Sequence, residues 1–333
     1  MSVATPFKKK AMQVASIGLA IAAAIVAPST VAAAELNCAN VTIISPYPPG
    51  GTTDILARLL GPGMSEKLGI PVIVDNKPGA SSNIGTEFVG RANPDGCTLL
   101  LGNNTGIVIN RNLYTLRLDP LQSLQPVAMV ASVPLILYVN PTKVSATTPQ
   151  ALLEELKANP DKYSFASGGS GSPQHLAGER IKQQKKVDML HVPYRGQGPA
   201  MSDVIAGHVP IAFETTTVVL PHVKANSVRA LATTSAKRIS MLPDVPTMVE
   251  SGFEDFVMEN WYGVFAPAGV APEIIQKLHE AVQFAMKKPD VVESLKKMGS
   301  SEVPDTIDEF KSFIAKEAPV WTEIVQKSGA RID

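Results

Sequence analysis

Short apolar runs alternate with helix-like segments along most of this chain, and this alternation constrains the fold more than any other feature. The runs Val41 to Ile44, Pro71 to Val74 and Cys97 to Leu101 are typical of strands, and segments with helical periodicity separate them. Strands that alternate with helices favour a parallel sheet covered by helices. Residues 41–101 are therefore predicted to form a βαβαβ unit.

A second unit of the same style follows, with strands predicted at 135–139, 163–166, 189–193 and 210–213. The chain becomes helical after Pro267, where Thr306 and Glu309 have the spacing of a capping box. Because no new strand follows Pro267, these last helices should return to the first sheet. We predict an α/β fold of two domains, each a mostly parallel sheet flanked by helices, joined by a hinge with two crossings. The domains are residues 35–133 with 259–333, and residues 134–258.

The first 34 residues have the pattern of an export signal. Lys8 to Lys10 form a basic segment, Ala11 to Ala27 is apolar, and Ala32 to Ala34 supply small residues for cleavage before Glu35. The apolar segment is short for a membrane span, although a retained anchor is the alternative reading. We therefore predict a signal peptide at residues 1–34, cleaved after Ala34, and an exported mature protein.

Charge and cysteine content narrow the possible partners and cofactors. Removing three lysines from the 30 basic residues leaves 27 against 30 acidic residues, with no basic block, which argues against nucleic acid as a partner. Neither cysteine belongs to a C-x-x-C pair and the histidines are scattered, so no metal site is predicted. The phosphate-loop and dinucleotide glycine patterns are absent, so no cofactor is predicted either.

Cys38 and Cys97 precede two strands that we expect to be neighbours in the first sheet. If these strands are parallel and adjacent, both cysteines lie at the same edge and come within bridging distance. Disulfides persist in an exported protein, so a Cys38–Cys97 bridge is one reading and two free thiols are the other.

Loops at the carboxyl ends of parallel strands are where open α/β sheets bind ligands. Two such loops, "PYPPGGTTD" and "SGGSGSPQH", lead directly into predicted helices at Thr52 and at Pro173. Free N–H groups and the helix dipole make such positions anion sites without a cationic side chain. Thr52, Thr53 and Ser172 could equally serve only as helix caps.

Three charged residues near these loops have two readings each. Asp54 favours the start of its helix, and most residues in such positions only cap or stabilise. Glu214 ends a strand and could accept a hydrogen bond from a ligand or form a hinge salt bridge. Arg195 could pair with a carboxylate or join the two domains.

Six blocks in succession resemble one known family. They are "ISPYPPGGTTDILARLL", "LGIPVIVDNKPGASSNIGTEFV", "NPDGCTLLLGNN", "SFASGGSGSPQHLAGE", "HVPYRGQGPAMSDVIAGHV" and "ALATTSAKRISMLPDVPTMVESGF". Together they cover the mature chain and resemble the Bug family, the TctC-type periplasmic receptors of tripartite tricarboxylate transporters. The resemblance implies a type II-like, two-domain periplasmic binding protein that captures a small carboxylate and delivers it to membrane permease subunits. It implies a monomer and no enzymatic activity.

The resemblance also implies a ligand site in the cleft, with no catalytic residue. Carried over position by position, that site consists of Tyr47, Gly51, Thr52, Thr53, Asp54, Asn103, Thr105, Ser167, Ser170, Gly171, Ser172, His175, Arg195, Glu214 and Thr215.

Two departures from the family pattern matter. Cys97 stands where the family usually has an aromatic residue, which supports the bridge to Cys38. Glu214 followed by three threonines stands where the family often has an aspartate, so the identity of the carboxylate stays open. Two other functions also stay open: a serine-type hydrolase using Ser170 or Ser172 with His175, and a ligand sensor for a signalling partner.

Overall fold

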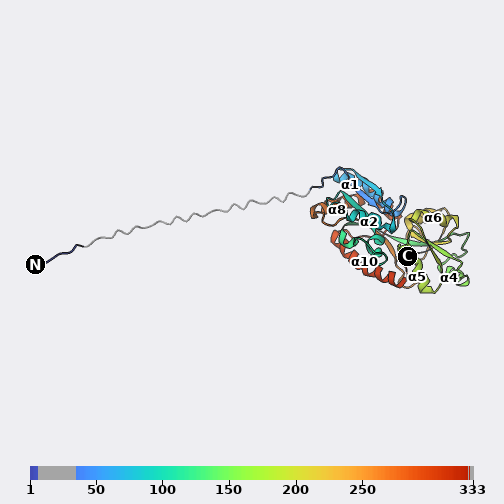
Figure 1. Cartoon of the computed structure of the whole chain (residues 1–333). Coiled ribbons are helices and arrows are strands. Elements are labelled where there is room, and N and C mark those ends of the chain that lie inside the picture. The colour runs from blue at the N-terminus through green and yellow to red at the C-terminus, as the bar shows by residue number, and fades with distance from the viewer. Residues whose placement is uncertain (7–34, 329, 331–333) are drawn as a thin grey trace. The chain divides into compact units, whose positions relative to one another are not determined.

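The structure is a computed structural model that describes residues 1–6, 35–328 and 330. The apolar segment and the cleavage site of the predicted signal peptide lie outside the described residues. The described residues from Glu35 onward belong to one compact unit, which holds every element discussed below (Figure 1). No helix within the described ranges is long and apolar enough to cross a membrane.

The described part of the chain forms one sheet in the strand order β2-β1-β3-β9-β4-β7-β5-β6, with β8 paired to β4 beside this path. The strands are β1 (Val41–Ser45), β2 (Val72–Asn76), β3 (Thr98–Asn103), β4 (Leu124–Val139), β5 (Ser164–Ser167), β6 (Leu190–Pro193), β7 (Ile211–Thr215), β8 (Arg229–Thr233) and β9 (Glu259–Pro267).

Strand β4 is 16 residues long and changes partners along its length. Its residues 124–134 pair with β9, its residues 135–139 pair with β7, and its residues 136–139 also pair with β8. The chain returns between β8 and β9, so it passes between the two halves of the sheet twice, as predicted. We call the half built on β1, β2, β3 and β9 the first lobe, and the half built on β5, β6, β7 and β8 the second lobe.

Parallel pairing is confined to the outer strands. β1 pairs in parallel with β2 and β3, and β5 pairs in parallel with β6 and β7. The pairings of β9 with β3 and β4, and of β4 with β7 and β8, are antiparallel. The sheet is mixed at its centre because β4 leaves the first lobe and β9 re-enters it in the opposite direction.

The helices cover both lobes. They are α1 (Thr52–Leu68), α2 (Asn83–Gly90), α3 (Pro120–Ser123), α4 (Pro149–Ala158), α5 (Pro173–Lys185), α6 (Gln197–Ala206), α7 (Thr216–Lys224), α8 (Pro272–Met286), α9 (Pro289–Lys297) and α10 (Ile307–Ser328), with short turns η1 (Ala80–Ser82), η2 (Thr105–Ile109) and η3 (Asn110–Asn112).

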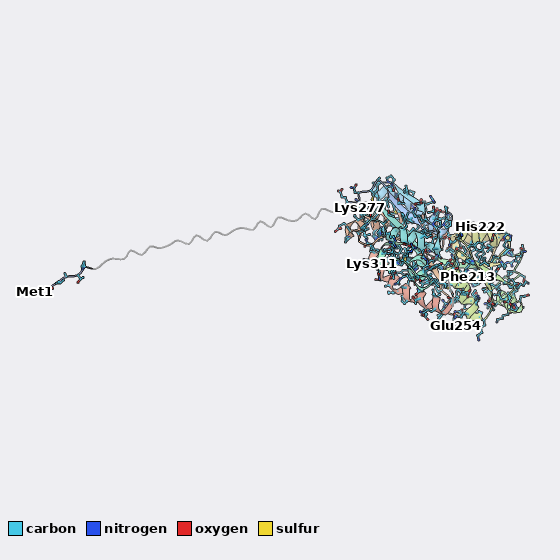
Figure 2. The ribbon with its side chains drawn as sticks, viewed as in Figure 1. Met1, Phe213, His222, Glu254, Lys277 and Lys311 are labelled. Atoms are coloured by element: carbon cyan, nitrogen blue, oxygen red, sulfur yellow. A yellow bond between two sulfur atoms is a disulfide. The ribbon has the colours of Figure 1, made fainter. Side chains whose placement is uncertain are left out.

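The C-terminal helices return to the first lobe, as the sequence predicts, but α10 also packs against α5 of the second lobe. α8 lies against α1, and their apolar faces share one buried cluster with β1 and β9 (Figure 1). α10 begins at the predicted capping box, in which Thr306 Oγ1 accepts from the Glu309 N–H and Glu309 Oε2 accepts from the Thr306 N–H. Side chains of the central strands such as Phe213 are buried, whereas Lys277 and Lys311 are exposed (Figure 2).

Cys38 and Cys97 form a disulfide, with their Cα atoms 5.7 Å apart. β1 and β3 are parallel neighbours, and the Thr42 N–H donates to the Cys97 carbonyl at 2.8 Å. The bridge therefore ties the segment before β1 to the start of β3, and the prediction of a disulfide is confirmed.

Candidate functional site

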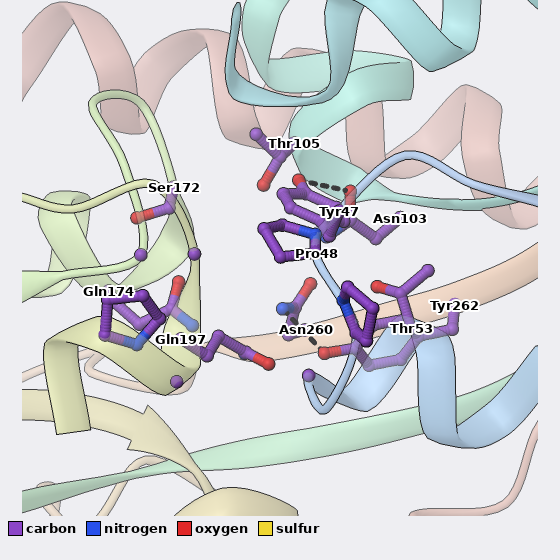
Figure 3. Close-up of a pocket in the computed structure, with 16 residues that line it drawn as sticks. Tyr47, Pro48, Thr53, Asn103, Thr105, Ser172, Gln174, Gln197, Asn260 and Tyr262 are labelled. Atoms are coloured by element: carbon purple, nitrogen blue, oxygen red, sulfur yellow. Dashed lines mark hydrogen bonds between the residues drawn. The ribbon is translucent and has the colours of Figure 1, made fainter. Parts of the chain in front are cut away.

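The two lobes enclose a cavity where several strands and helices meet. We call this cavity the inner compartment (Figure 3). Its lining residues are Tyr47, Pro48, Pro49, Gly51, Thr53, Asn103, Thr105, Gly168, Ser172, Gln174, Gly196, Gln197, Gly198, Pro199, Asn260 and Tyr262.

A wider cavity adjoins it. This outer compartment shares Tyr47, Pro48, Gly168 and Gly196 with the inner one. Its other lining residues are Pro78, Gly79, Ala80, Ser81, Ser82, Tyr114, Gly169, Ser170, Pro193, Tyr194 and Arg195.

The first-lobe wall is built from the loop after β1 and the start of α1. Gly50 has a φ of +89°, a left-handed conformation that favours glycine and lets the loop turn into the helix. Burial raises the pKa of Tyr47, whose hydroxyl therefore stays protonated and donates to Asn103 Oδ1 at 3.2 Å. α1 starts at Gly51 without any side-chain cap from its own loop.

The second-lobe wall is built from the starts of α5 and α6. Ser172 caps α5, and its Oγ accepts from the His175 backbone N–H at 3.3 Å. Gln174 lies in the first turn of α5, and Gln197 is the first residue of α6. The N-termini of α1, α5 and α6 therefore all open onto the inner compartment.

The inner compartment is polar but uncharged. Its described lining residues include hydroxyl, amide and backbone N–H groups and no Asp, Glu, Lys or Arg. Thr105 and Asn260 are 1% and 2% exposed, and Thr105 Oγ1 and Asn260 Oδ1 have no hydrogen-bond partner among the described residues. Buried polar atoms without partners are rare in folded proteins, so these two atoms are available to a bound molecule.

Glu214 lies directly behind this wall, 1% exposed, at the end of β7. Its Oε1 accepts from Gln197 Nε2 at 2.6 Å, from Gln174 Nε2 at 2.9 Å and from the Thr215 N–H at 2.6 Å. Burial raises the pKa of Glu214 to about 7, although these donors act to lower it. Glu214 therefore orients both lining glutamines instead of facing the cavity itself.

Contacts across the two lobes close one side of the site. Gln197 Oε1 accepts from the Thr52 N–H at 2.9 Å, and the hydroxyls of Thr52 and Thr215 are 2.8 Å apart. On the other side, Ser81 Oγ donates to the Ser170 carbonyl at 2.9 Å. The predicted residues Thr52 and Thr215 thus bind each other and do not line either cavity.

Asp54 is held inside the first lobe. Its carboxylate accepts from Arg58 Nε at 3.0 Å, from Asn76 Nδ2 at 2.9 Å and from the Gly50 N–H at 3.0 Å. Burial acts to raise the pKa of Asp54, but these hydrogen bonds and the charge of Arg58 outweigh it and leave the pKa below its ordinary value. Asp54 braces the loop before α1 and is not among the residues that line the cavities.

Two stacked histidines support the serine–glycine loop from behind. The rings of His175 and His191 lie 3.7 Å apart, and burial lowers their pKa values to about 4 and about 3. His175 Nδ1 accepts from the Gly171 N–H at 3.0 Å, and Ser167 Oγ lies 2.7 Å from His191 Nε2. Among the described residues, the His175 imidazole thus hydrogen-bonds the backbone of Gly171, and the only hydrogen bond from His175 to a serine of the hydrolase alternative is that of its backbone N–H, which Ser172 caps.

The structure brings part of the predicted ligand set together at the cavities. Tyr47, Gly51, Thr53, Asn103, Thr105 and Ser172 line the inner compartment, and Tyr47, Ser170 and Arg195 line the outer one. The remaining predicted residues lie behind these walls: Thr52, Asp54, Ser167, Gly171, His175, Glu214 and Thr215.

Sequence reasoning missed several lining residues, above all Gln174, Gln197 and Asn260. The two glutamines sit inside loops that the sequence does single out, "SGGSGSPQH" and "YRGQGP", and a position in the first turn of a helix was the available signal. Asn260 precedes the aromatic pair of β9, and no motif marks it.

Comparisons with known proteins place the chain in a family. Residues 56–330 match the family model described as "Tripartite tricarboxylate transporter family receptor". The chain is 36% identical to protein BugT of Bordetella pertussis over 320 residues, which cover 96% of this chain and 98% of BugT.

Solved structures agree with this. The periplasmic binding protein BugD is 33% identical, with a TM-score of 0.83, and the match covers 88% of this chain and 98% of BugD. Rpa4515 of R. palustris, solved with adipate, is 29% identical with a TM-score of 0.84, and the match covers 88% of this chain and 98% of that one. The fold is therefore that of a two-domain periplasmic binding protein, and the chain belongs to the Bug family of TctC-type solute receptors.

Proposed function

We propose that this protein captures a small carboxylate in the inner compartment and delivers it to the membrane permease of a tripartite tricarboxylate-type transporter. A periplasmic solute-binding role follows from the family. The chemistry of the cavity supports a carboxylate as the solute, and the family description supports a permease as the partner.

The observation that carries the proposal is the meeting of three helix N-termini at an uncharged cavity. α1, α5 and α6 are 17, 13 and 10 residues long, and the first turn of each lines the inner compartment. The positive ends of helix dipoles and their free N–H groups stabilise an anion. A carboxylate can therefore be held there by neutral donors, without the cost of burying an unpaired lysine or arginine.

The predicted domains would act as two jaws. β4 exchanges β9 for β7 between Pro134 and Leu135, and Pro134 pairs with Glu259, which supports the predicted boundaries near residues 134 and 259. A ligand that touches Thr53 on one side and Ser172 on the other would stabilise the closed arrangement by contacts available only there.

Binding measurements test this function directly. Purified protein is titrated calorimetrically with adipate, malate, glutamate, citrate and benzoate. Chromatography after incubation then measures whether each acid is chemically unchanged. We expect at least one acid to bind, and Thr53→Val and Ser172→Ala each to weaken it by roughly 1–3 kcal/mol, since each removes a donor to a charged group.

Thr147→Val is the matched control, because Thr147 is exposed and is not among the residues that line either cavity. Membrane vesicles that contain the permease subunits should take up the labelled acid only when the receptor is added. Turnover of the acid, or wild-type affinity in both variants, contradicts the proposal.

A further inference from the structure

We propose that Gln197 is a latch between the lobes: its side-chain amide, held by Glu214, caps helix α1 from across the cleft and so couples ligand capture to closure. This inference rests on the proposed function, because closure around a solute is what the latch would stabilise. Gln197 is here a positioning residue, and its action is through α1 and Glu214.

The second-lobe end of the latch is fixed by a buried acid. Gln197 Nε2 donates to Glu214 Oε1 at 2.6 Å, and the same oxygen also accepts from Gln174 and from the Thr215 N–H. Since the NH₂ group faces Glu214, the carbonyl oxygen of the Gln197 amide must face the other way, toward the first lobe. Figure 3 shows this side chain extending from the second-lobe wall toward Thr53.

The first-lobe end of the latch is the start of α1, which has no cap of its own. The N-cap position is Gly51, and Gln197 Oε1 accepts from the Thr52 N–H at 2.9 Å. A Cβ atom on Gly51 would lie only 3.0 Å from Gln197 Oε1, so a glycine there leaves room for the amide. A side chain 145 residues away thus performs the task that Ser, Thr, Asp or Asn usually performs locally.

The latch lines the same cavity that would hold the carboxylate. Gln197, Gly51 and Thr53 all face the inner compartment, and Thr52 itself is buried, so the Gln197–Thr52 hydrogen bond is shielded from water while the lobes are closed. Hydrogen bonds are stronger where water is excluded. Opening the lobes would separate Gln197 from Thr52 and leave the first N–H of α1 to water.

The latch also changes how the anion is held. Because Gln197 already occupies the Thr52 N–H, a carboxylate has to use other donors of the compartment. The remaining positive end of α1 still favours the anion, but the direct partners lie elsewhere on the lining.

Two variants test the latch. Gln197→Met keeps the length and volume of the side chain and removes both hydrogen bonds. Gln184→Met is the matched control, because Gln184 is an exposed glutamine of α5 whose Nε2 donates to the Glu254 carbonyl at 3.0 Å within the second lobe. Both are made in the full mature protein, with the disulfide intact.

Two measurements are made on each variant. Spin labels at Glu273→Cys on α8 and Lys157→Cys on α4, both exposed, report the distance between the lobes without ligand. Stopped-flow kinetics give the association and dissociation rates of whichever acid of the panel binds the wild type. For Gln197→Met we expect a shift toward longer distances and an approximately tenfold faster dissociation, with association within about twofold. Gln184→Met should match the wild type in both.

Two results would contradict the latch, and a third would contradict the proposed function. An unchanged distance distribution and dissociation rate in Gln197→Met overturns the latch, as does a lower melting temperature with unchanged closure, which marks a merely structural side chain. If no acid binds the wild type, the proposed function fails, and the distance measurement alone decides the latch.

Discussion

The two walls of the inner compartment are built alike but completed differently. On the second-lobe wall, Ser172 caps α5 from within its own loop. On the first-lobe wall, α1 begins at Gly51 and receives its hydrogen-bond acceptor from Gln197 of the opposite lobe. The helix N-terminus of one wall is therefore capped by a local residue, and that of the other is capped only when the two lobes are in contact.

The buried acids behind the two walls differ in their partners and in the direction of their pKa shifts. Asp54 in the first lobe is paired with Arg58 and has a lowered pKa. Glu214 in the second lobe is surrounded by neutral donors from Gln174, Gln197 and Thr215, and burial raises its pKa to about 7. The acid that holds the latch is thus the one whose charge is costly.

Giving α1 its own cap would make the two walls alike, and we expect the largest effect from this change. Gly51→Asp is sterically in the way of Gln197 and places a carboxylate beside the proposed anion site. The backbone φ of −83° at position 51 can be adopted by any residue. Repulsion between two carboxylates about 4 Å apart at a partly screened site is worth about 4 kcal/mol.

Calorimetry should therefore show close to a thousandfold weaker binding of the acid to Gly51→Asp. The melting temperature without ligand should change little, because the aspartate cap replaces the hydrogen bond that Gln197 loses. Strong binding by this variant would show that the anion lies away from α1.

Removing the costly charge is the next test. The pKa of Glu214 in the folded protein, about 7, lies above its ordinary 4.5, so its contribution to stability is full below pH 4.5 and lost as the pH rises through about 7. Between pH 5 and pH 8 the wild type should lose up to roughly 3 kcal/mol of unfolding free energy relative to Glu214→Gln. Urea titrations at both pH values measure this difference, and parallel curves would contradict the raised pKa.

The smallest effect is expected at Asp54, which lies behind the first-lobe wall. Asp54→Asn removes the charge that Arg58 and the Gly50 N–H stabilise, and should cost about 1–2 kcal/mol of stability at pH 7. Since the folded pKa is lowered, this loss should shrink as the pH falls through the folded pKa, below the ordinary value of 3.8. Ligand affinity should change less than twofold, and a larger change would move Asp54 into the ligand site.

The parts of the fold that depend on local chemistry could be predicted from the sequence. Thr148 and Thr306 cap α4 and α10 where the sequence indicates, since a cap needs only residues three positions apart. The first half of β4 was not predicted, because Pro126 and Pro134 interrupt an otherwise apolar run and a proline cannot donate to a strand ladder. α7 was not predicted either, because it begins with threonines and contains Pro221.

The site residues also fall into those that local sequence predicts and those that it does not. Gly51, Thr53 and Ser172 could be placed at the cavity because each begins a helix after a strand. Gln197 could not, because its two partners, Thr52 and Glu214, are brought to it by tertiary packing and no spacing in the chain records their distance. A glutamine in a loop carries no motif of its own.

The single strand shared by both lobes has a mechanical consequence. β4 keeps its ladder to β9 on one side of Pro134 and to β7 and β8 on the other, and Pro134 itself has no N–H to contribute at the point of exchange. A rotation of the lobes can then be absorbed by elastic twisting of one continuous ribbon, with no backbone hydrogen bond of the proline to break. We therefore expect a rotation of limited amplitude with an elastic restoring force, whereas domains joined by an unstructured linker rotate without one.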